Sequence, residues 1–247
     1  MRVLVCDDLA QEGIDILKQE FDVDVRTKLS EDELVEIIPN YDAIVVRSAT
    51  KVTQRVIENS DLKVIGRAGV GVDNIDVDTA TKRGILVVNA PEGNTIAASE
   101  HTVALLMAAA RNIPAAVMSL KNKKWDRKKF MGMELRGKTL GVVGLGRIGK
   151  DVAKKAIGLG MNVIAYDPYV IKDHVESLNV KVADLDTVLK EADFITFHVP
   201  MNKSTYHMIN KERIEMMKDG VIIINCARGG IIDEAALYDG LVSGKIA

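Results

Sequence analysis

The stretch Gly144-Leu145-Gly146-Arg147-Ile148-Gly149 decides the fold of the second half of this chain. It follows an apolar run at residues 139–143 and precedes a helix-like segment at residues 150–159. Asp167 ends the next apolar run, residues 162–166, close to the spacing that the dinucleotide-binding pattern Gly-x-Gly-x-x-Gly requires. Strand, glycine turn, helix, strand and acid in this order predict a dinucleotide site.

The three glycines have different tasks in such a site. Gly144 lets the chain turn sharply out of the strand, Gly146 lets the backbone approach a pyrophosphate, and Gly149 lets the new helix pack closely on the sheet. The helix N-terminus offers unpaired N–H groups and a partial positive charge to the phosphates. Asp167 can accept hydrogen bonds from both ribose hydroxyls and would repel a 2′-phosphate, which favours NAD over NADP. The alternative is a glycine-rich turn that binds nothing.

The composition limits the partners and the location. With 33 basic and 35 acidic residues, the net charge of −2 gives no electrostatic reason to expect nucleic acid or an anionic membrane as a partner. No run approaches the roughly 20 apolar residues of a membrane span, and the first residues read as a strand rather than a signal peptide. Cys6 and Cys226 have no metal-like spacing with another Cys or His, so we expect no metal site and a cytoplasmic location.

The rest of the chain alternates short apolar strands with amphipathic helices up to about residue 90, which is a βαβ rhythm. Two helical segments then interrupt this rhythm, at residues 96–111 and 115–123. A second α/β region follows, with strands expected at residues 139–143, 162–166, 194–198 and 221–225. We therefore predict an α/β fold with two doubly wound parallel-sheet domains, residues 1–95 and 96–247.

An arginine follows the last of these strands, in the sequence Asn-Cys-Ala-Arg-Gly-Gly at residues 225–230. Ligands of open parallel sheets bind outside the carboxyl ends of the strands, where Arg228, Cys226, His198 and Val199 all fall. A guanidinium there can bind the carboxylate of a 2-hydroxy or 2-keto acid through two hydrogen bonds and polarise the reacting carbonyl. From these residues alone, a surface arginine bonded to a helix end is an equal alternative.

Four stretches in order carry a resemblance to a known family. Residues 46–53 read Val-Arg-Ser-Ala-Thr-Lys-Val-Thr, residues 66–74 read Gly-Arg-Ala-Gly-Val-Gly-Val-Asp-Asn, and residues 125–132 read Trp-Asp-Arg-Lys-Lys-Phe-Met-Gly. Together with residues 225–230, they resemble the D-isomer 2-hydroxyacid dehydrogenases over essentially the whole chain. The resemblance implies a flavodoxin-like substrate domain before residue 96, a Rossmann NAD-binding domain after it, and hydride transfer between a 2-hydroxy acid and NAD.

The resemblance also implies roles for single residues. The cofactor residues that it implies are Gly144, Gly146, Arg147, Ile148 and Gly149 around the pyrophosphate, Asp167 at the adenosine ribose, Val199, Cys226 and Ala227 at the nicotinamide side, and Val70. Relatives often have threonine at the position of Val70, so a contact there would be made by the backbone or by apolar atoms. Arg228 matches the catalytic arginine, and the backbone of Gly69, Val70 and Gly71 would bind the substrate carboxylate.

A phosphorylated substrate needs further positive charge, and the candidates in the matching stretches are Arg47, Arg67, Arg127 and Lys129. Without the resemblance, the charged run at residues 121–129 would be read as a solvated surface. The implied reaction is the oxidation of 3-phosphoglycerate to 3-phosphohydroxypyruvate, the first step of serine biosynthesis. Two alternatives stay open: a dehydrogenase for another 2-hydroxy acid, and an NAD-sensing binding protein that resembles transcriptional corepressors.

The resemblance further implies a histidine base, supported by a glutamate, both downstream of the loop at residues 225–230. None of the four histidines, His101, His174, His198 and His207, stands in the required motif, and His198 is interpreted as finishing a strand. We therefore expect a piece of a longer enzyme that keeps cofactor binding and largely loses turnover. We also expect a homo-oligomer built through the nucleotide domain, with the helices at residues 96–111 and 115–123 as its interface.

Overall fold

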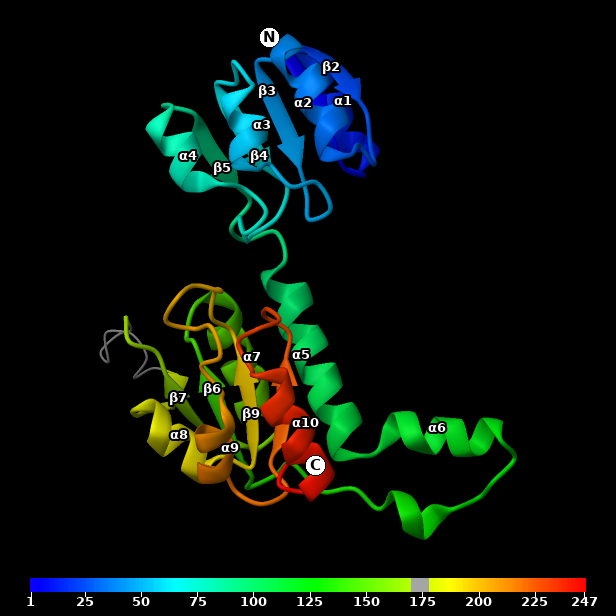
Figure 1. Cartoon of the computed structure of the whole chain (residues 1–247). Helices are drawn as coiled ribbons and strands as arrows, with labels where there is room; N and C mark the ends of the chain where they lie inside the picture. The colour runs from blue at the N-terminus through cyan, green and yellow to red at the C-terminus, as the bar shows by residue number, and fades with distance from the viewer. Residues whose placement is uncertain (170–177) are drawn as a thin grey trace. The chain divides into compact units, whose positions relative to one another are not determined.

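The computed structural model of the chain describes residues 1–169 and 178–247 (Figure 1). They form two compact units, Met1–Asn94 (unit 1) and Thr95–Ala247 (unit 2). Each unit contains one five-stranded sheet whose paired strands are all parallel, and helices of the described residues connect most of the successive strands. This confirms the predicted α/β class with two parallel sheets.

The sheet of unit 1 has the strand order β2-β1-β3-β4-β5. Its strands are β1 (Arg2–Val5), β2 (Asp22–Val25), β3 (Ala43–Val46), β4 (Val64–Arg67) and β5 (Leu86–Asn89). This 2-1-3-4-5 order is that of flavodoxin-like folds, as the resemblance implies, and its direction reverses between β1 and β3. The carboxyl ends of these two strands therefore flank the point where ligands bind in such sheets.

Helices cover the sheet of unit 1 because each presents an apolar face to it. They are α1 (Gln11–Glu20), α2 (Glu31–Ile37), α3 (Gln54–Glu58) and α4 (Val77–Lys82), with the 3-10 turn η1 (Ile38–Asn40) after α2. Leu34 of α2 and Val56 of α3 pack with Ile44 and Ile65 of the sheet in one buried cluster. Ser30 begins α2 through a capping box with Glu33, in which each side chain accepts a backbone N–H of the other residue.

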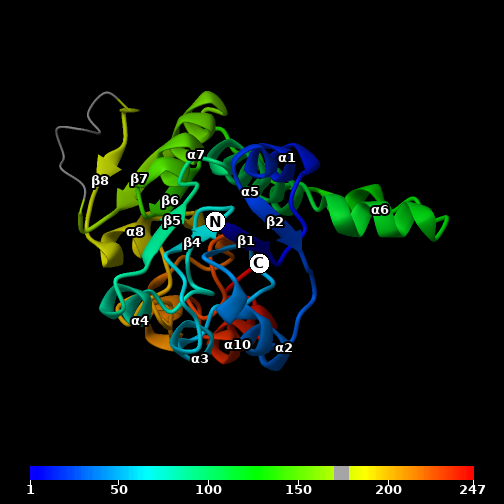
Figure 2. The same ribbon diagram turned by 90° about the horizontal axis from the view of Figure 1, so that it is seen from above.

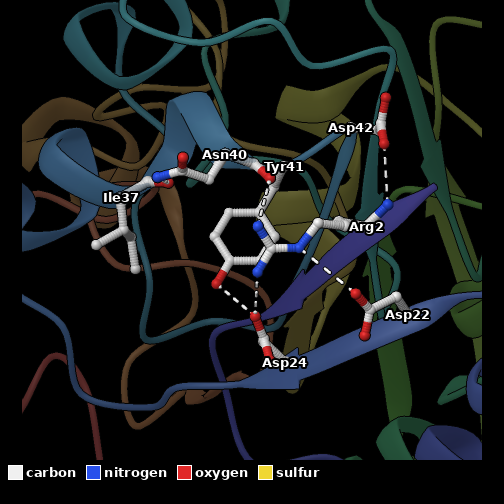
Figure 3. A network of polar contacts seen from close by, with 7 residues as sticks. All are labelled: Arg2, Asp22, Asp24, Ile37, Asn40, Tyr41 and Asp42. Carbon is white, nitrogen blue, oxygen red and sulfur yellow. Dashed lines mark hydrogen bonds and ion pairs between the residues drawn. The ribbon is translucent and has the colours of Figure 1, made fainter.

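Ion pairs tie together the amino ends of β1, β2 and β3 (Figure 3). The guanidinium of Arg2 lies 3.0 Å from an oxygen of Asp24 and stands over the ring of Tyr41, whose hydroxyl donates to the same carboxylate at 2.8 Å. The Arg2 N–H donates to Asp42 at 2.9 Å. The hydrogen bond from Tyr41, followed by those from Arg2, holds the pKa of Asp24 below its usual range. Solvent screens these exposed pairs, so they fix register more than they add stability.

The sheet of unit 2 has the strand order β10-β9-β6-β7-β8. Its strands are β6 (Thr139–Val143), β7 (Asn162–Tyr166), β8 (Lys181–Val182), β9 (Phe194–Phe197) and β10 (Ile222–Asn225). Counted from β6, the order is 3-2-1-4-5, which is the Rossmann order, and its direction reverses between β6 and β9. The hydrophobic pattern did not predict β8, because two residues are too few to show a period.

Two groups of helices cover opposite faces of this sheet. One face carries α5 (Thr95–Ala110) and α7 (Arg147–Gly158), and the other carries α8 (Leu185–Glu191), α9 (Lys211–Met216) and α10 (Glu234–Ser243). Leu106 of α5 and Val152 of α7 share a buried cluster with Val142 of β6. The neighbouring strand residue, Val143, points to the other face and packs with Val188 of α8.

Helix α6 (Ile113–Lys121) extends away from the rest of unit 2 in both views (Figures 1 and 2). The sequence predicted a helix that starts after Pro114, but the structure starts it at Ile113, with the proline in the first turn. Proline is tolerated there because the first helical N–H groups have no partner inside the helix. Among the described residues, no single helix is long and apolar enough to span a membrane, and the pair α5 and α6, bent by 64°, passes that test by length and composition only.

Candidate cofactor site at the carboxyl edge of unit 2

The last residues of four strands form one row in unit 2. Val143 of β6 pairs with Tyr166 of β7 on one side and with Phe197 of β9 on the other. Phe197 in turn pairs with Asn225 of β10. At about 4.8 Å between strands, the row from β7 to β10 is roughly 14 Å long. The loops after these four ends therefore lie along a single edge, in the order Asp167, the Gly144 turn, Val199 and the Arg228 loop.

The glycine turn after β6 has the close approaches that its sequence predicted. Gly144 has φ +97°, and a Cβ on it would lie 2.6 Å from the carbonyl oxygen of His198 and 2.9 Å from Cγ1 of Val199. A Cβ on Gly149 would lie 1.9 Å from the carbonyl oxygen of Gly144. Both positions exclude any side chain, so the turn and the start of α7 pack directly on β9 and on each other.

Gly146 differs from its two neighbours because a Cβ on it would meet no protein atom within 4 Å. Gly146 is also the N-cap of α7 and, as a glycine, makes no side-chain cap hydrogen bond. The space over the turn is thus open at the N-terminus of α7, which fits a pyrophosphate at this place. Arg147 is exposed at the first helical position, and Ile148 is half-buried against the core.

The Asp167 carboxylate is held by backbone groups. One oxygen accepts the N–H of Leu145, inside the glycine turn, at 2.8 Å, and the other accepts the N–H of Tyr169 at 2.9 Å. These two bonds fix the carboxylate beside the turn, and each oxygen keeps a further lone pair. The arrangement leaves Asp167 able to accept hydrogen bonds from a pair of neighbouring hydroxyls.

The loop that carries Arg228 starts with a side-chain turn. The amide of Asn225 donates to the carbonyl of Arg228 at 2.9 Å, and its oxygen accepts the N–H of Ala227 at 3.0 Å. The Arg228 guanidinium donates to the Ala227 carbonyl at 2.8 Å, and Gly230 then closes the loop with φ +73°. Asp233 caps the following helix α10 by accepting the N–H groups of Ala235 and Ala236.

Apolar side chains line the row between the glycine turn and Arg228. Val199 and Ala227 pack against the cluster on one face of the sheet, and Cys226 packs against the cluster on the other face. All three are half-buried. The edge thus changes from a polar end at Asp167 to an apolar middle and a cationic end at Arg228.

Of the histidines, His198 lies at this edge, but it is poorly suited to act as a base. Burial lowers the pKa of His198 to about 4, and its Nε2 lies 3.1 Å from the hydroxyl of Thr196. A group with such a pKa is neutral near pH 7 and accepts a proton poorly. The His207 ring stacks on Tyr206, and His174 lies outside the described residues.

The carboxyl edge of unit 1 carries two of the predicted arginines. The backbone N–H of Arg47 donates to buried Asp7 at 2.5 Å, and its guanidinium donates to the Asp8 carbonyl at 3.2 Å. The hydroxyl of Thr50 also donates to Asp7, at 2.8 Å. Sequence reasoning missed Asp7, although an acid directly after a buried strand was a visible signal.

Arg67, at the end of β4, folds over the loop that follows it. A Cβ on Gly69 would lie 1.8 Å from its Nη1, so the guanidinium occupies the space that a side chain would need. The Arg67 Nε is buried and has no hydrogen-bond partner in the part of the chain that the structure describes. The Val70 carbonyl accepts the side-chain amide of Asn89 at 2.6 Å, and Gly71 is half-buried beside it.

Arg127 belongs to unit 2 rather than to the unit that contains the other two arginines. It begins the 3-10 turn η2 (Arg127–Phe130) after α6 and is exposed, like Lys129. The run at residues 121–129 thus forms a solvated basic segment on unit 2. Within unit 1, Arg47 and Arg67 lie at the ends of neighbouring strands, since Val46 pairs with Arg67, and Arg67 covers Gly69.

The described residues contain one hollow away from this edge and no candidate metal site. A hollow of about 590 Å³ opens between α9 and α10, lined by Lys211, Asp219 and Lys245 among others, but Asp219 precedes β10, so this hollow is at the opposite edge of the sheet. No group of three or more His, Cys, Asp or Glu side chains among residues 1–169 and 178–247 is arranged to hold a metal ion.

Comparison with known proteins identifies the family. Residues 103–247 match the model described as "D-isomer specific 2-hydroxyacid dehydrogenase, NAD binding domain". The chain belongs to this family. The match starts inside α5 and covers the whole row of strand ends, so the family's NAD-binding domain is the part that contains the glycine turn and Asp167.

Individual relatives of the family are similar over the whole chain. D-3-phosphoglycerate dehydrogenase of Archaeoglobus fulgidus is 56% identical over 100% of this chain and 47% of its own length. Hydroxypyruvate reductase of Thermotoga maritima is 51% identical over 99% of this chain and 80% of its own length. The chain therefore spans about half the length of the archaeal relative. Among solved structures, D-lactate dehydrogenase of Aquifex aeolicus with NAD and lactic acid has a TM-score of 0.89 and 33% identity, over 100% of this chain and 74% of its own.

Proposed function

We propose that this protein transfers a hydride between NAD and a 2-hydroxy acid. The observation that carries the proposal is the row of strand ends in unit 2, where a glycine turn, an acid and an arginine follow neighbouring parallel strands. An extended dinucleotide fits such a row because its phosphates need uncapped N–H donors and its ribose needs a hydrogen-bond acceptor. NAD supplies the hydride acceptor when it is bound.

We assign the cofactor contacts along this row. The N–H groups at Arg147 and Ile148, above open Gly146, would bind the pyrophosphate, and Asp167 would accept the hydroxyls of the adenosine ribose. Val199, Cys226 and Ala227 would line the nicotinamide side with apolar surface. The cofactor contact that the resemblance implies for Val70, a residue of unit 1, stays a separate prediction.

We assign Arg228 to the substrate. Its guanidinium stands after β10, past the apolar stretch of the row, where it can bind a carboxylate and polarise the C2 carbonyl. The hydroxyl proton must go to a base, and the pKa of His198, about 4 because of burial, argues against this residue. Among residues 1–169 and 178–247, we assign the base to none.

We propose 3-phosphoglycerate as the substrate, with oxidation to 3-phosphohydroxypyruvate as the first step of serine biosynthesis. Several relatives with 47 to 56% identity are named D-3-phosphoglycerate dehydrogenase. On unit 1, Arg47 and Arg67 are the candidates for the phosphate, and the backbone of Gly69 and Gly71 would bind the carboxylate, since glycine permits close approach. On unit 2, Arg127 is the candidate for the phosphate. Because one relative is named hydroxypyruvate reductase, another 2-hydroxy acid is the second candidate substrate.

Ligand binding tests the substrate assignment independently of turnover. The affinities of the NADH-loaded chain for 3-phosphoglycerate and for unphosphorylated glycerate are measured by calorimetry. Arg47→Ala and Arg127→Ala should weaken 3-phosphoglycerate at least about tenfold more than glycerate, whereas the neighbouring Lys128→Ala should change neither. Equal losses for both ligands would refute the phosphate assignment. NADH-gated recruitment of a protein partner without any affinity for either acid would favour the corepressor-like alternative.

We propose that the protein is a cytoplasmic homo-oligomer that assembles through unit 2. Helix α6 supports this because no residue of it is buried, while Ile113, Met118 and Leu120 are each about half exposed. An apolar helix in water is stabilised when a second copy covers it. Met118→Glu should shift the protein to monomer in sedimentation velocity, whereas Lys121→Glu, at the end of the same helix, should not. A monomeric wild type would contradict the proposal.

A further inference from the structure

The loop between β9 and α9 has little regular structure but several side-chain hydrogen bonds. The side-chain oxygen of Asn202 accepts the N–H groups of Ser204 and Thr205, at 2.8 and 3.1 Å. Buried Thr205 donates its hydroxyl to the Pro200 carbonyl at 2.6 Å and accepts the N–H of Asn202 at 2.8 Å. These bonds fix the backbone that leads to Tyr206 and His207.

This loop is joined to the end of the Arg228 loop. The N–H of His207 donates to the carbonyl of Gly230 at 2.7 Å, and the N–H of Ile209 donates to the carbonyl of Ile231 at 3.0 Å. Asn225 holds the first half of the Arg228 loop, as described above. The second half, Gly229 and Gly230, therefore depends on contacts with the loop after β9.

Side chains complete this contact at Gly230. A Cβ on this residue would lie 3.2 Å from Cε of Met201 and 3.6 Å from two ring carbons of Tyr206, so Met201 and the ring lie directly over its Cα. Gly230 has φ +73°, a conformation that glycine enters easily but also leaves easily. A ring packed against it restricts this freedom.

Tyr206 is itself held in place by its neighbour. The rings of Tyr206 and His207 stack with centroids 4.0 Å apart and planes 14° from parallel. His207 adopts φ +47°, which is uncommon for a residue with a side chain and is concentrated at functional sites. Yet Tyr206 remains 61% exposed, so the ring is not there to fill the core.

We propose that Tyr206, braced by the His207 ring, is a positioning residue that holds the Gly229–Gly230 turn and thereby orients Arg228 toward the acid ligand. The inference rests on the proposed function of Arg228. Tyr206 touches neither ligand in this account, and it acts by limiting the backbone motion of the loop after β10. Because the ring rather than the hydroxyl contacts Gly230, phenylalanine should replace it.

The experiment compares Tyr206→Ala with the conservative variant Tyr206→Phe and with Lys203→Ala, an exposed control in the same loop. Backbone ¹⁵N relaxation of the Gly229 and Gly230 amides reports the loop directly, without any ligand. We expect higher mobility of both amides in Tyr206→Ala only. In parallel, the affinity of the NADH-loaded chain for 3-phosphoglycerate should fall about tenfold in Tyr206→Ala and return with Tyr206→Phe, while the affinity for NADH stays within about twofold.

The outcomes separate this inference from the proposed function. Unchanged Gly229 and Gly230 amides in Tyr206→Ala would overturn the inference, whatever the ligand data show. A more mobile loop with unchanged affinity for 3-phosphoglycerate would also overturn it, provided that Arg228→Ala weakens this ligand. If Arg228→Ala has no effect on the acid, the proposed role of Arg228 fails, and the orienting part of the inference fails with it.

Discussion

At the carboxyl edge of unit 1, arginines follow the strands: Arg47 comes after β3, and Arg67 ends β4 and lies over Gly69. At the same edge of unit 2, β6 and β7 are followed by an open glycine turn and by Asp167. The first edge offers cationic side chains, and this part of the second edge offers backbone N–H donors with one acceptor, while Arg228 follows β10 farther along it. Two parallel sheets of similar size thus present different chemistry, because different residues follow their strands. Unit 1 suits an anionic acid, and unit 2 suits a dinucleotide.

The largest expected effect comes from adding a side chain to the glycine turn of unit 2. In Gly149→Ala, the new Cβ would overlap the carbonyl of Gly144, so α7 must move away from the turn at a cost of about 3 kcal/mol. We expect the affinity for NADH to fall at least about 100-fold in a fluorescence titration, together with a lower melting temperature.

Gly146→Ala is the matched control for this change. Its Cβ meets no protein atom within 4 Å, so the melting temperature should stay unchanged while the NADH affinity still falls. If Gly146→Ala binds NADH as tightly as the wild type, the open space over the turn is not the cofactor site.

A second contrast between the units is their response to acid. All four histidines of the sequence lie in unit 2, and burial lowers the pKa of His198 to about 4. The unfolded chain, with a pKa of about 6.5, binds this proton more readily, so stability is lost as the pH falls below about 6.5. Unit 2 should lose about 2 kcal/mol between pH 7 and about pH 5, measured by urea unfolding with probes in each unit.

His198→Gln keeps a hydrogen-bonding group beside Thr196 but cannot take up the proton. In this variant, the stability of unit 2 should become nearly independent of pH over the same range. An unchanged pH dependence would show that other groups cause it.

Asp167 tests the acceptor at the unit 2 edge. In Asp167→Asn, the side-chain oxygen can still accept the N–H of Leu145, but the negative charge that faces the ribose is lost. We expect NADH to bind about tenfold more weakly and the preference for NADH over NADPH to shrink by a similar factor in calorimetry. Asp186→Asn, exposed on α8, should change neither, and an intact cofactor preference in Asp167→Asn would contradict the assignment.

The smallest effect is expected at the edge of unit 1. Gly69→Ala would push the Arg67 guanidinium aside, which is possible without unfolding because only the end of a flexible side chain moves. The affinity for 3-phosphoglycerate should fall several-fold, up to about tenfold, with the NADH affinity unchanged. Gly13→Ala, in α1 with open space around it, is the control. A loss of NADH affinity in Gly69→Ala would contradict the assignment of the anionic acid to unit 1 and of the dinucleotide to unit 2.

The parts of the molecule that sequence predicted are those fixed by local chemistry. The glycine turn and Asp167 were predicted because each needs a special residue at a fixed distance along the chain. The alternation of strands and helices predicted two parallel sheets, and the resemblance implied their flavodoxin-like and Rossmann folds. Pro114 was misjudged because proline both ends helices and begins them, and only the structure distinguishes the two cases.

The contacts that sequence reasoning missed depend on residues far apart in the chain. Asp7 accepts hydrogen bonds from residues some 40 positions later, Arg47 and Thr50. Tyr206 lies over Gly230, which no periodic pattern relates to it. Roles in ligand binding stay predictions for Arg47, Arg67, Arg127 and Arg228. The position of a guanidinium group does not identify the anion that it binds.

Amide hydrogen exchange with and without NADH tests the central claim most directly. NADH should slow exchange in the turn at residues 144–149 and in the loop at residues 225–228, because the cofactor would lie along the row of strand ends from β6 to β10 in unit 2. Unchanged exchange in the turn at residues 144–149, at NADH concentrations that saturate binding, would contradict it.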